Sequence, residues 1–177
     1  TNGSYLSFGF IGRFAKDKGL IELIDAWRKI NLDYPNCKLI IAGFQDERDP
    51  IPNEYLNIIE KNSINISYLG KIKDQLFFYS KINVLILPSY REGFPTVVLE
   101  ASSLKKAIIT TKVTGCVDSI IENKTGLFCN TNSDSIQNSI QFFVNNPVKV
   151  VEFGENGRNF VVENFDEKIL WKQFIKV

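Results

Sequence analysis

The order of apolar runs and helical patterns along the chain most constrains what it can fold into. Continuous apolar runs bounded by turn residues predict strands over Tyr5–Gly12, Lys38–Gly43, Ile66–Leu69, Val84–Leu87, Ala107–Thr111 and Gly126–Phe128. Between the runs, apolar residues recur at helical spacing, first at Leu20, Leu23, Ile24, Trp27 and Ile30 and then at Tyr55, Ile58 and Ile59. Strands without polar alternation need cover on both faces, and the intervening helices supply it.

The connections between such strands set the fold class. Because a crossover between parallel strands is right-handed, we predict an α/β fold, a Rossmann-like, doubly wound parallel sheet of about six strands with helices on both faces. From residue 133 onward the pattern is helical only, over 136–144, 148–162 and 166–177. No linker divides the chain, and 177 residues suit one core, so we expect a single domain over 1–177.

Charge and residue content exclude several classes of function. A formal net charge of +1 offers no surface for a polyanion, so we expect no nucleic-acid partner. The chain has no histidine, and its three cysteines, Cys37, Cys116 and Cys129, lack CxxC spacing. A Ser-His-Asp triad, a His metal site and a zinc knuckle are therefore excluded, and buried thiols in a reducing compartment are expected.

The ends of the chain bear on its location. No apolar stretch reaches the roughly 18 residues of a membrane span, and TNGSYLSFGF lacks the basic and apolar regions of a signal peptide. We therefore expect a cytoplasmic protein. WKQFIKV stops within an amphipathic pattern without a Gly or Pro, which is typical of a piece of a longer chain.

Loops that follow parallel strands carry the ligand-binding chemistry of such sheets, and four stand out here, at 12–19, 42–50, 88–95 and 111–119. In the first, Gly12 allows close backbone approach, while Arg13, Lys16 and Lys18 suit a diphosphate at the start of a helix. The alternative is that these cations are solvated loop charges. Neither GxxxxGK[ST] nor GxGxxG is present, which disfavours nucleoside triphosphate and NAD sites.

The third loop, PSYREGFP, is the most informative. Gly93 allows close approach, Pro95 suits the first position of a helix, and the free amides of the first turn favour an anion or sugar hydroxyls. Glu100 lies at the edge of the apolar stripe of that helix, where a carboxylate suits two vicinal ribose hydroxyls. The alternatives are that Glu100 is a structural acid satisfied by an amide or a cation, and that Glu92 is a surface acid paired to Arg91.

The loop around Gly115 and the spacing of Asp46 and Asp49 are weaker signals. Gly115 in VTGCVDSI opens a short predicted helix that would offer amides to a ligand. No Asp-x-Asp pair is present, because Asp46 and Asp49 have the wrong spacing. We therefore expect no metal site, and Arg and Lys would have to neutralise a diphosphate.

These motifs together resemble the C-terminal, donor-binding half of a family-4 retaining glycosyltransferase with the two-domain GT-B fold. The likeness covers essentially the whole chain, through GRFAKDKG, the Leu69-Gly70 strand end, VLILPSYREGFPTVVLEAS with its E-x7-E pair, VTGCVDSIIENKTGLF and NFDEKILW. The segments AGFQDERDPIP, SYREGFP and TGCVDSI resemble those of the bacterial subgroup that builds capsule, O-antigen and related glycan repeats, often on lipid-linked acceptors.

The resemblance implies a role for each matching residue. Catalytic contacts with the diphosphate and sugar would come from Arg13, Lys18 and Glu92, without a protein nucleophile and with retention at the sugar. The donor would also be held by Gly12, by Gly93, Phe94, Pro95 and Thr96, by Glu100 at the ribose, and by Gly70, Lys71 and Ile72 against the base. The donor is a nucleoside-diphosphate sugar, with UDP favoured, and no cofactor is expected.

Two departures from the family pattern limit the transfer of roles. AGFQDERD replaces a Gly-Asp-Gly-Pro type of turn, which leaves a phosphate contact there in doubt. The N-terminal acceptor domain is absent from this chain, so we expect donor binding without turnover. In the intact enzyme, a lipid-linked glycan acceptor would bring the protein to the inner face of the membrane.

Two other functions stay open at this point. A non-catalytic nucleotide-binding or interaction module, such as a flavodoxin-like receiver, would need an acidic cluster at the end of the first strand, where Arg13 stands. One half of a nucleotide-sugar epimerase of GT-B architecture is the second alternative, and the sequence of the other half would decide it.

Overall fold

Six parallel strands form one sheet through the centre of the molecule in the computed structural model, which describes residues 5–165. The strands are β1 (Ser7–Phe14), β2 (Lys38–Gln45), β3 (Ile66–Tyr68), β4 (Val84–Leu87), β5 (Ala107–Thr111) and β6 (Gly126–Cys129). Their order is β3-β2-β1-β4-β5-β6, and every neighbouring pair is parallel. The strand order therefore reverses between β1 and β4, which is where sheets of this kind bind their ligands.

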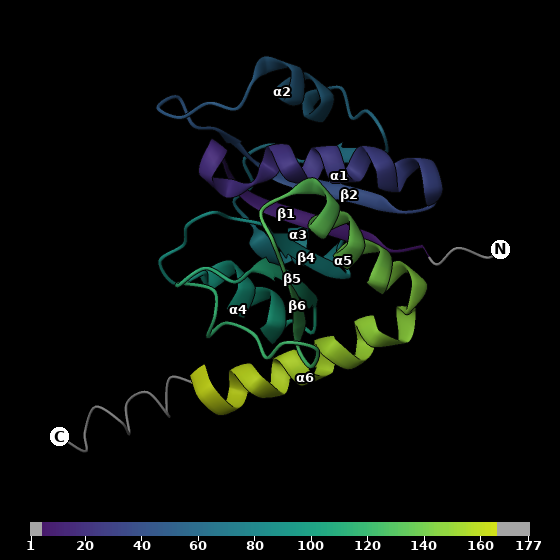
Figure 1. Cartoon of the computed structure of the whole chain (residues 1–177). Helices are drawn as coiled ribbons and strands as arrows, with labels where there is room; N and C mark the ends of the chain where they lie inside the picture. Colours follow the sequence, from purple (N-terminus) through teal and green to yellow (C-terminus); the bar gives the residue numbers. More distant parts are fainter. Residues whose placement is uncertain (1–4, 166–177) are drawn as a thin grey trace.

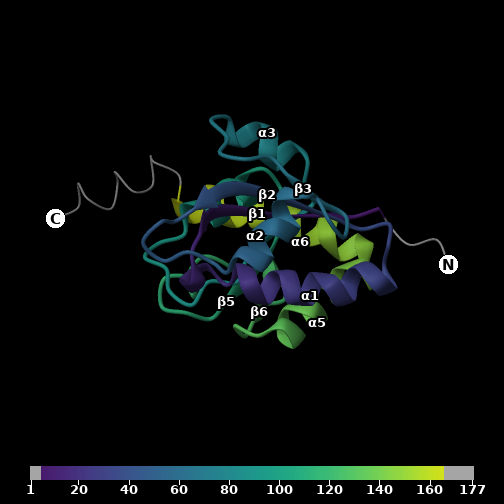
Figure 2. The same ribbon diagram turned by 90° about the horizontal axis from the view of Figure 1, so that it is seen from above.

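Helices cover both faces of the sheet. They are η1 (Lys16–Lys18), α1 (Leu20–Asp33), α2 (Asn53–Glu60), α3 (Gln75–Ser80), α4 (Thr96–Ser103), α5 (Ser133–Asn145) and α6 (Pro147–Phe165). Helices α1 and α5 lie together on one side of the sheet and α3 lies on the other, as Figures 1 and 2 show. The long helix α6 packs against α4 and β5 at the edge of the molecule. The predicted doubly wound α/β fold is confirmed.

The core is divided by the sheet into two clusters. The larger one includes Phe8, Trp27 and Ile109, and the smaller one includes Tyr79 and Ile108 under α3 and α4. Ile108 and Ile109 are neighbours in β5 that belong to different clusters, because successive strand side chains point to opposite faces. The candidate site is built mainly on the side of the smaller cluster.

Several predicted boundaries are wrong by a few residues. Strand β1 continues past Gly12 to Phe14, and β2 continues past Gly43 to Gln45. The two strands stay paired over these residues, as in the pair of Arg13 with Phe44. Helix α4 begins one residue after Pro95. The short helix predicted at Gly115 is a series of turns, and α3 had no counterpart in the prediction. The predicted helix over 166–177 lies outside the described residues.

Candidate functional site

A pocket opens where the strand order reverses, and we call it the switch-point pocket. Its volume is about 240 Å³. Its lining comes from β1, the loop after it, and the segment from β4 into α4: Phe10, Ile11, Gly12, Arg13, Lys18, Leu87, Glu92, Phe94, Pro95, Thr96 and Val97. The structure thus brings together the three residues predicted to be catalytic and four of those predicted to hold the donor.

The two buried charges of this pocket neutralise each other. Lys18 Nζ lies 2.9 Å from Glu92 Oε1, and both side chains are about five-sixths buried, with 16% and 14% exposed. Glu92 is therefore not paired to Arg91, which instead faces Asp17 at 3.9 Å. The alternative that the loop cations are simply solvated holds for Lys16, whose side chain is 61% exposed. It does not hold for Lys18, which is largely buried.

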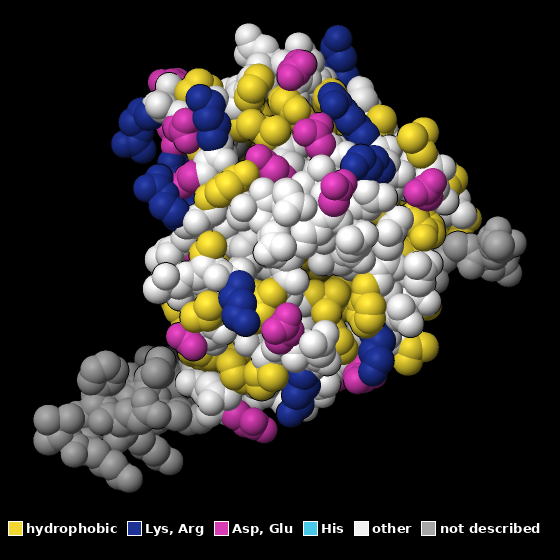
Figure 3. All heavy atoms as spheres, viewed as in Figure 1, with side chains coloured by type: hydrophobic (Ala, Val, Ile, Leu, Met, Phe, Trp, Pro, Cys, Tyr) yellow, Lys and Arg dark blue, Asp and Glu magenta, His cyan; other side chains and the backbone are white. Residues whose placement is uncertain are grey.

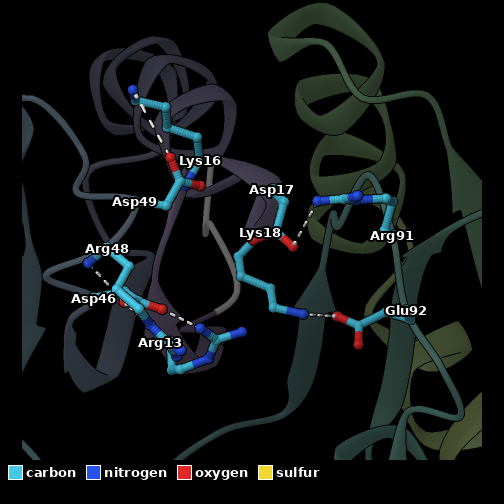
Figure 4. A network of polar contacts seen from close by, with 9 residues as sticks. All are labelled: Arg13, Lys16, Asp17, Lys18, Asp46, Arg48, Asp49, Arg91 and Glu92. Carbon is cyan, nitrogen blue, oxygen red and sulfur yellow. Dashed lines mark hydrogen bonds and ion pairs between the residues drawn. The ribbon is translucent and has the colours of Figure 1, made fainter.

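The third charge of the pocket, Arg13, is held from behind by Asp46. The Arg13 guanidinium donates to Asp46 Oδ2, and the Arg48 amide donates to Asp46 Oδ1 at 3.0 Å (Figure 4). The Arg48 amide first, and then the Arg13 guanidinium, lower the pKa of Asp46 against the opposing effect of burial. Asp46 stays ionised, and Arg13 keeps a half-exposed guanidinium at the pocket.

The loops around the pocket pack directly on one another. Gly19 has a left-handed φ of 67°, and a Cβ there would overlap the Pro88 carbonyl. The Tyr90 amide donates to the Asp17 carbonyl at 2.8 Å. These contacts join η1 to the segment after β4, so Lys18 and Glu92 are held in place by backbone as well as by their ion pair. Charged side chains of both signs gather at this end of the molecule, at the upper left of Figure 3.

The start of α4 offers backbone donors to the pocket, but not all of the predicted ones. The Thr96 amide donates to the Phe94 carbonyl at 3.0 Å, and Pro95 has no N–H. Within the described part of the chain, the amides of Gly93, Phe94 and Val97 make no hydrogen bond. Val97 is thus a donor that sequence reasoning missed, because a shift of one residue in the helix start changes which amides are free.

Glu100 lies one helical turn after Thr96 and borders a second pocket, which we call the α3–α4 pocket. It measures about 300 Å³ and is lined by Lys73, Asp74, Gln75, Leu76, Tyr79, Glu100, Ser103 and Leu104. Glu100 is half-buried, as its position at the edge of the apolar stripe predicts. The Tyr79 hydroxyl donates to Glu100 Oε2 at 2.7 Å. Among the described residues, no backbone amide and no Lys or Arg side chain contacts the Glu100 carboxylate. The alternative of a structural acid held by an amide or a cation is therefore not supported.

Burial and this hydrogen bond together raise the pKa of the Tyr79 hydroxyl, in that order of importance. Tyr79 therefore stays protonated and donates to the carboxylate at any physiological pH. Sequence reasoning missed Tyr79, although an aromatic residue with a hydroxyl on a buried helix face generally has a polar partner.

The loop after β3 carries the three residues predicted to lie against a base. Gly70 has a φ of 69°, and its carbonyl accepts from the Gly43 amide at 2.9 Å. The Lys71 ammonium lies 4.8 Å from the centre of the Phe44 ring. Ile72 packs on the smaller core cluster, and the next residue, Lys73, lines the α3–α4 pocket. Gly70, Lys71 and Ile72 thus lead into that pocket and do not line it.

Residues 5–165 do not combine into a metal site or a membrane span. No group of three or more His, Cys, Asp and Glu side chains in that range has the arrangement of a metal site. Asp49, like Asp46, faces a cation, since Lys16 lies 3.8 Å from its carboxylate. No helix in the described range is long and apolar enough to cross a membrane.

Fold and site together define a Rossmann-like domain whose switch-point pocket is lined by Arg13, Lys18 and Glu92. Residues 2–160 match the model of the family described as glycosyl transferases group 1. The chain belongs to this family.

Individual proteins are similar to this chain in sequence or in fold. The capsular polysaccharide biosynthesis glycosyltransferase CapM of Staphylococcus aureus is 31% identical over 166 residues, which cover 93% of this chain and 43% of CapM. Sucrose-phosphate synthase of Thermosynechococcus elongatus is 26% identical with a TM-score of 0.82, covering 98% of this chain and 44% of that one. S. aureus TarM, solved with UDP, has a TM-score of 0.85 at 22% identity over 97% of this chain and 35% of its own. The chain thus spans less than half of these proteins.

Proposed function

We propose that this chain is the donor-binding domain of a retaining, metal-independent glycosyltransferase, which transfers a sugar from a UDP-sugar during bacterial surface polysaccharide synthesis. One observation carries the proposal. Arg13, Lys18 and Glu92 converge on one pocket at the switch point, and Glu100 borders the next pocket one turn along α4. This spacing suits an extended ligand with an anionic centre, a sugar at one end and a nucleoside at the other.

The diphosphate of the donor would lie between Arg13 and Lys18. Binding replaces the Glu92 partner of Lys18 by phosphate oxygens, which leaves the Glu92 carboxylate free to accept hydrogen bonds from the sugar hydroxyls. The amides of Phe94 and Val97, two residues that line the pocket, would provide further donors, and Gly93 between Glu92 and Phe94 would add a third. The buried ion pair thus keeps both charges neutralised until the donor separates them.

Charge stabilisation is the chemical task of this arrangement. When the bond from the sugar to the diphosphate breaks, negative charge grows on the leaving phosphate, and Arg13 and Lys18 lie where they would neutralise it. Asp46 and Asp49 already face cations of the chain, which supports a site that works through Arg and Lys. The same arrangement gives no support to a signalling module, which would need acids where Arg13 stands.

The rest of the reaction is proposed to lie outside this chain. Because the chain covers 43% of CapM, an N-terminal domain would supply the acceptor side of the cleft, and the chain alone would bind donor without turnover. The capsule role of CapM supports a glycan acceptor, and we extend this to a lipid-linked glycan at the inner membrane face. The UDP in the TarM structure supports UDP as the nucleotide.

Replacing Glu100 tests the nucleotide site. We expect UDP and UDP-sugars to raise the melting temperature of the chain, and Glu100→Ala to weaken UDP binding roughly tenfold, since charge-assisted hydrogen bonds to the ribose are lost. Calorimetric titration with UDP, GDP and ADP measures the affinities and the base preference. Glu54→Ala removes an exposed acid of α2 and is the control. Equal affinity of wild type and Glu100→Ala for UDP would contradict the role of Glu100.

A further inference from the structure

Tyr79 is the feature that the proposed site does not yet explain. Its side chain is 1% exposed, so its hydroxyl is cut off from water and needs a partner inside the protein. Two acceptors are near, Glu100 Oε2 at 2.7 Å and the Val97 carbonyl at 3.3 Å. A phenol has one proton, and the closer, ionised oxygen of Glu100 is the stronger acceptor. The hydrogen bond therefore joins α3 to the carboxylate on α4.

This bond restrains one half of the Glu100 carboxylate. A glutamate side chain has three rotatable bonds, and it loses this freedom when it grips a ligand. Tyr79 is the one hydrogen-bond donor to this carboxylate within residues 5–165, and it contacts Oε2 only. Oε1 is left without a protein donor in that range, on a residue that lines the α3–α4 pocket.

The aromatic ring of Tyr79 does not account for its hydroxyl. The ring packs edge-on against Phe78 with centroids 5.4 Å apart and belongs to the smaller core cluster. A phenylalanine would fill the same volume and would avoid burying a polar group. What the hydroxyl adds at this position is the bond to Glu100.

We propose that Tyr79 is a positioning residue for nucleotide recognition, holding the Glu100 carboxylate at the edge of the α3–α4 pocket so that its free oxygen accepts hydrogen bonds from the ribose hydroxyls of the donor. This inference rests on the proposed role of Glu100. It adds a second residue, on a different element, that sets how well the nucleotide is held by acting through the Glu100 carboxylate.

A double-mutant cycle on the chain, with UDP as the probe, tests the inference. We expect Tyr79→Phe to weaken UDP binding about five- to tenfold, within the range for ordering one long side chain on binding, because Glu100 would no longer be held in place. In a Glu100→Ala background, Tyr79→Phe should have no further effect, because there is no carboxylate left to position. The same substitution should weaken 2′-deoxy-UDP less than UDP, since one ribose hydroxyl is missing.

Tyr55→Phe is the matched control. The Tyr55 hydroxyl also donates to a carboxylate, Asp25 Oδ2 at 3.1 Å, but neither residue lines either pocket. Its removal should leave UDP affinity unchanged, and circular dichroism will show that each variant is folded.

The outcomes separate this inference from the proposed function. If Glu100→Ala weakens UDP and Tyr79→Phe does not, the positioning role is overturned while the nucleotide site stands. If Tyr79→Phe weakens UDP equally with and without the Glu100 carboxylate, the hydroxyl acts through general packing and the inference is also overturned. If neither UDP, GDP nor ADP binds the wild-type chain, the proposed function fails and the positioning role fails with it.

Discussion

At the scale of single residues, Asp46 holds the Arg13 guanidinium beside the switch-point pocket. The carboxylate is almost fully buried and receives both the Arg48 amide and the Arg13 guanidinium, which lower its pKa from the ordinary 3.8. Below that ordinary value, the unfolded chain binds a proton that the folded chain excludes. The ionised Asp46 therefore stabilises the fold fully above about pH 4. This contribution is lost as the pH falls from the ordinary pKa through the lowered pKa of the folded chain.

Asp46→Asn tests this dependence. We expect the variant to melt at a lower temperature than wild type at pH 7. The difference should begin to shrink below about pH 4, where the unfolded wild-type chain binds a proton at Asp46, and should vanish below the lowered pKa of the folded chain. Melting curves between pH 2.5 and pH 7 measure it. Asp49→Asn, on the same loop but with a half-exposed carboxylate, is the control. A difference that stays constant across this range would show that the charge of Asp46 does not matter.

At the scale of elements, the site depends on three loops that approach one another closely. A Cβ on Gly115 would overlap the carbonyl oxygens of Glu92 and Gly93, so the loop after β5 supports the segment that carries Glu92. Overlap with backbone cannot be relieved by a side-chain rotation. The segment at 92–93 would have to move.

We expect Gly115→Ala to destabilise the chain by about 1–3 kcal/mol, as overpacking does, and also to weaken UDP-sugar binding because Glu92 is displaced. Urea unfolding and calorimetric titration measure the two effects. Gly93→Ala is the control from the other side of the same contact, because a Cβ there meets nothing within 4 Å. Its free energy of unfolding should rise by about 0.4–1 kcal/mol, because alanine restricts the unfolded chain and meets no obstacle in the fold. Equal stability of both variants would show that the loops adjust freely.

The elements also show what could be predicted from the sequence. Strand β4 and strand β5 were predicted with their observed bounds, because buried parallel strands are continuous apolar runs. Strand β1 was ended too early at Gly12, since the charged Arg13 interrupts the apolar run, and the strand continues to Phe14 through its pairing with β2. The short helix α3 was missed because its six residues are too few to show a helical period.

The same limit applies to the candidate site. Arg13, Lys18, Glu92 and Glu100 were found because motif positions follow strand ends. Their partners were not, since Asp46 lies 33 residues from Arg13 and Tyr79 lies 21 residues from Glu100. Such pairs are formed when the crossovers bring separate loops and helices together. The local sequence pattern therefore does not predict them. The predicted roles of the donor-binding residues stay predictions.

At the scale of the whole molecule, one sheet organises both the core and the site. The strand order places the carboxyl ends of β1 and β4 side by side, so the cations after β1 meet the acid after β4. Helix α4 then carries the site from the switch-point pocket to the α3–α4 pocket. We propose that this chain carries the donor end of a transfer reaction and that the acceptor end lies on the remainder of a longer protein.

Joining this chain to its proposed N-terminal half gives the last prediction. The chain alone should bind a UDP-sugar without transferring it, whereas the full-length protein should transfer the sugar with retention at the anomeric carbon, measured from proton NMR couplings of the product. Because Arg13 and Lys18 are proposed to face the leaving phosphate, and Asp46 and Asp49 are paired with cations, EDTA should change the rate by less than about twofold. Lys18→Gln should lower the transfer rate roughly a hundredfold in the same assay, since it removes a charge that stabilises the leaving group. Loss of transfer in EDTA that Mg²⁺ restores, or a product of inverted configuration, would contradict the mechanism proposed for the pocket.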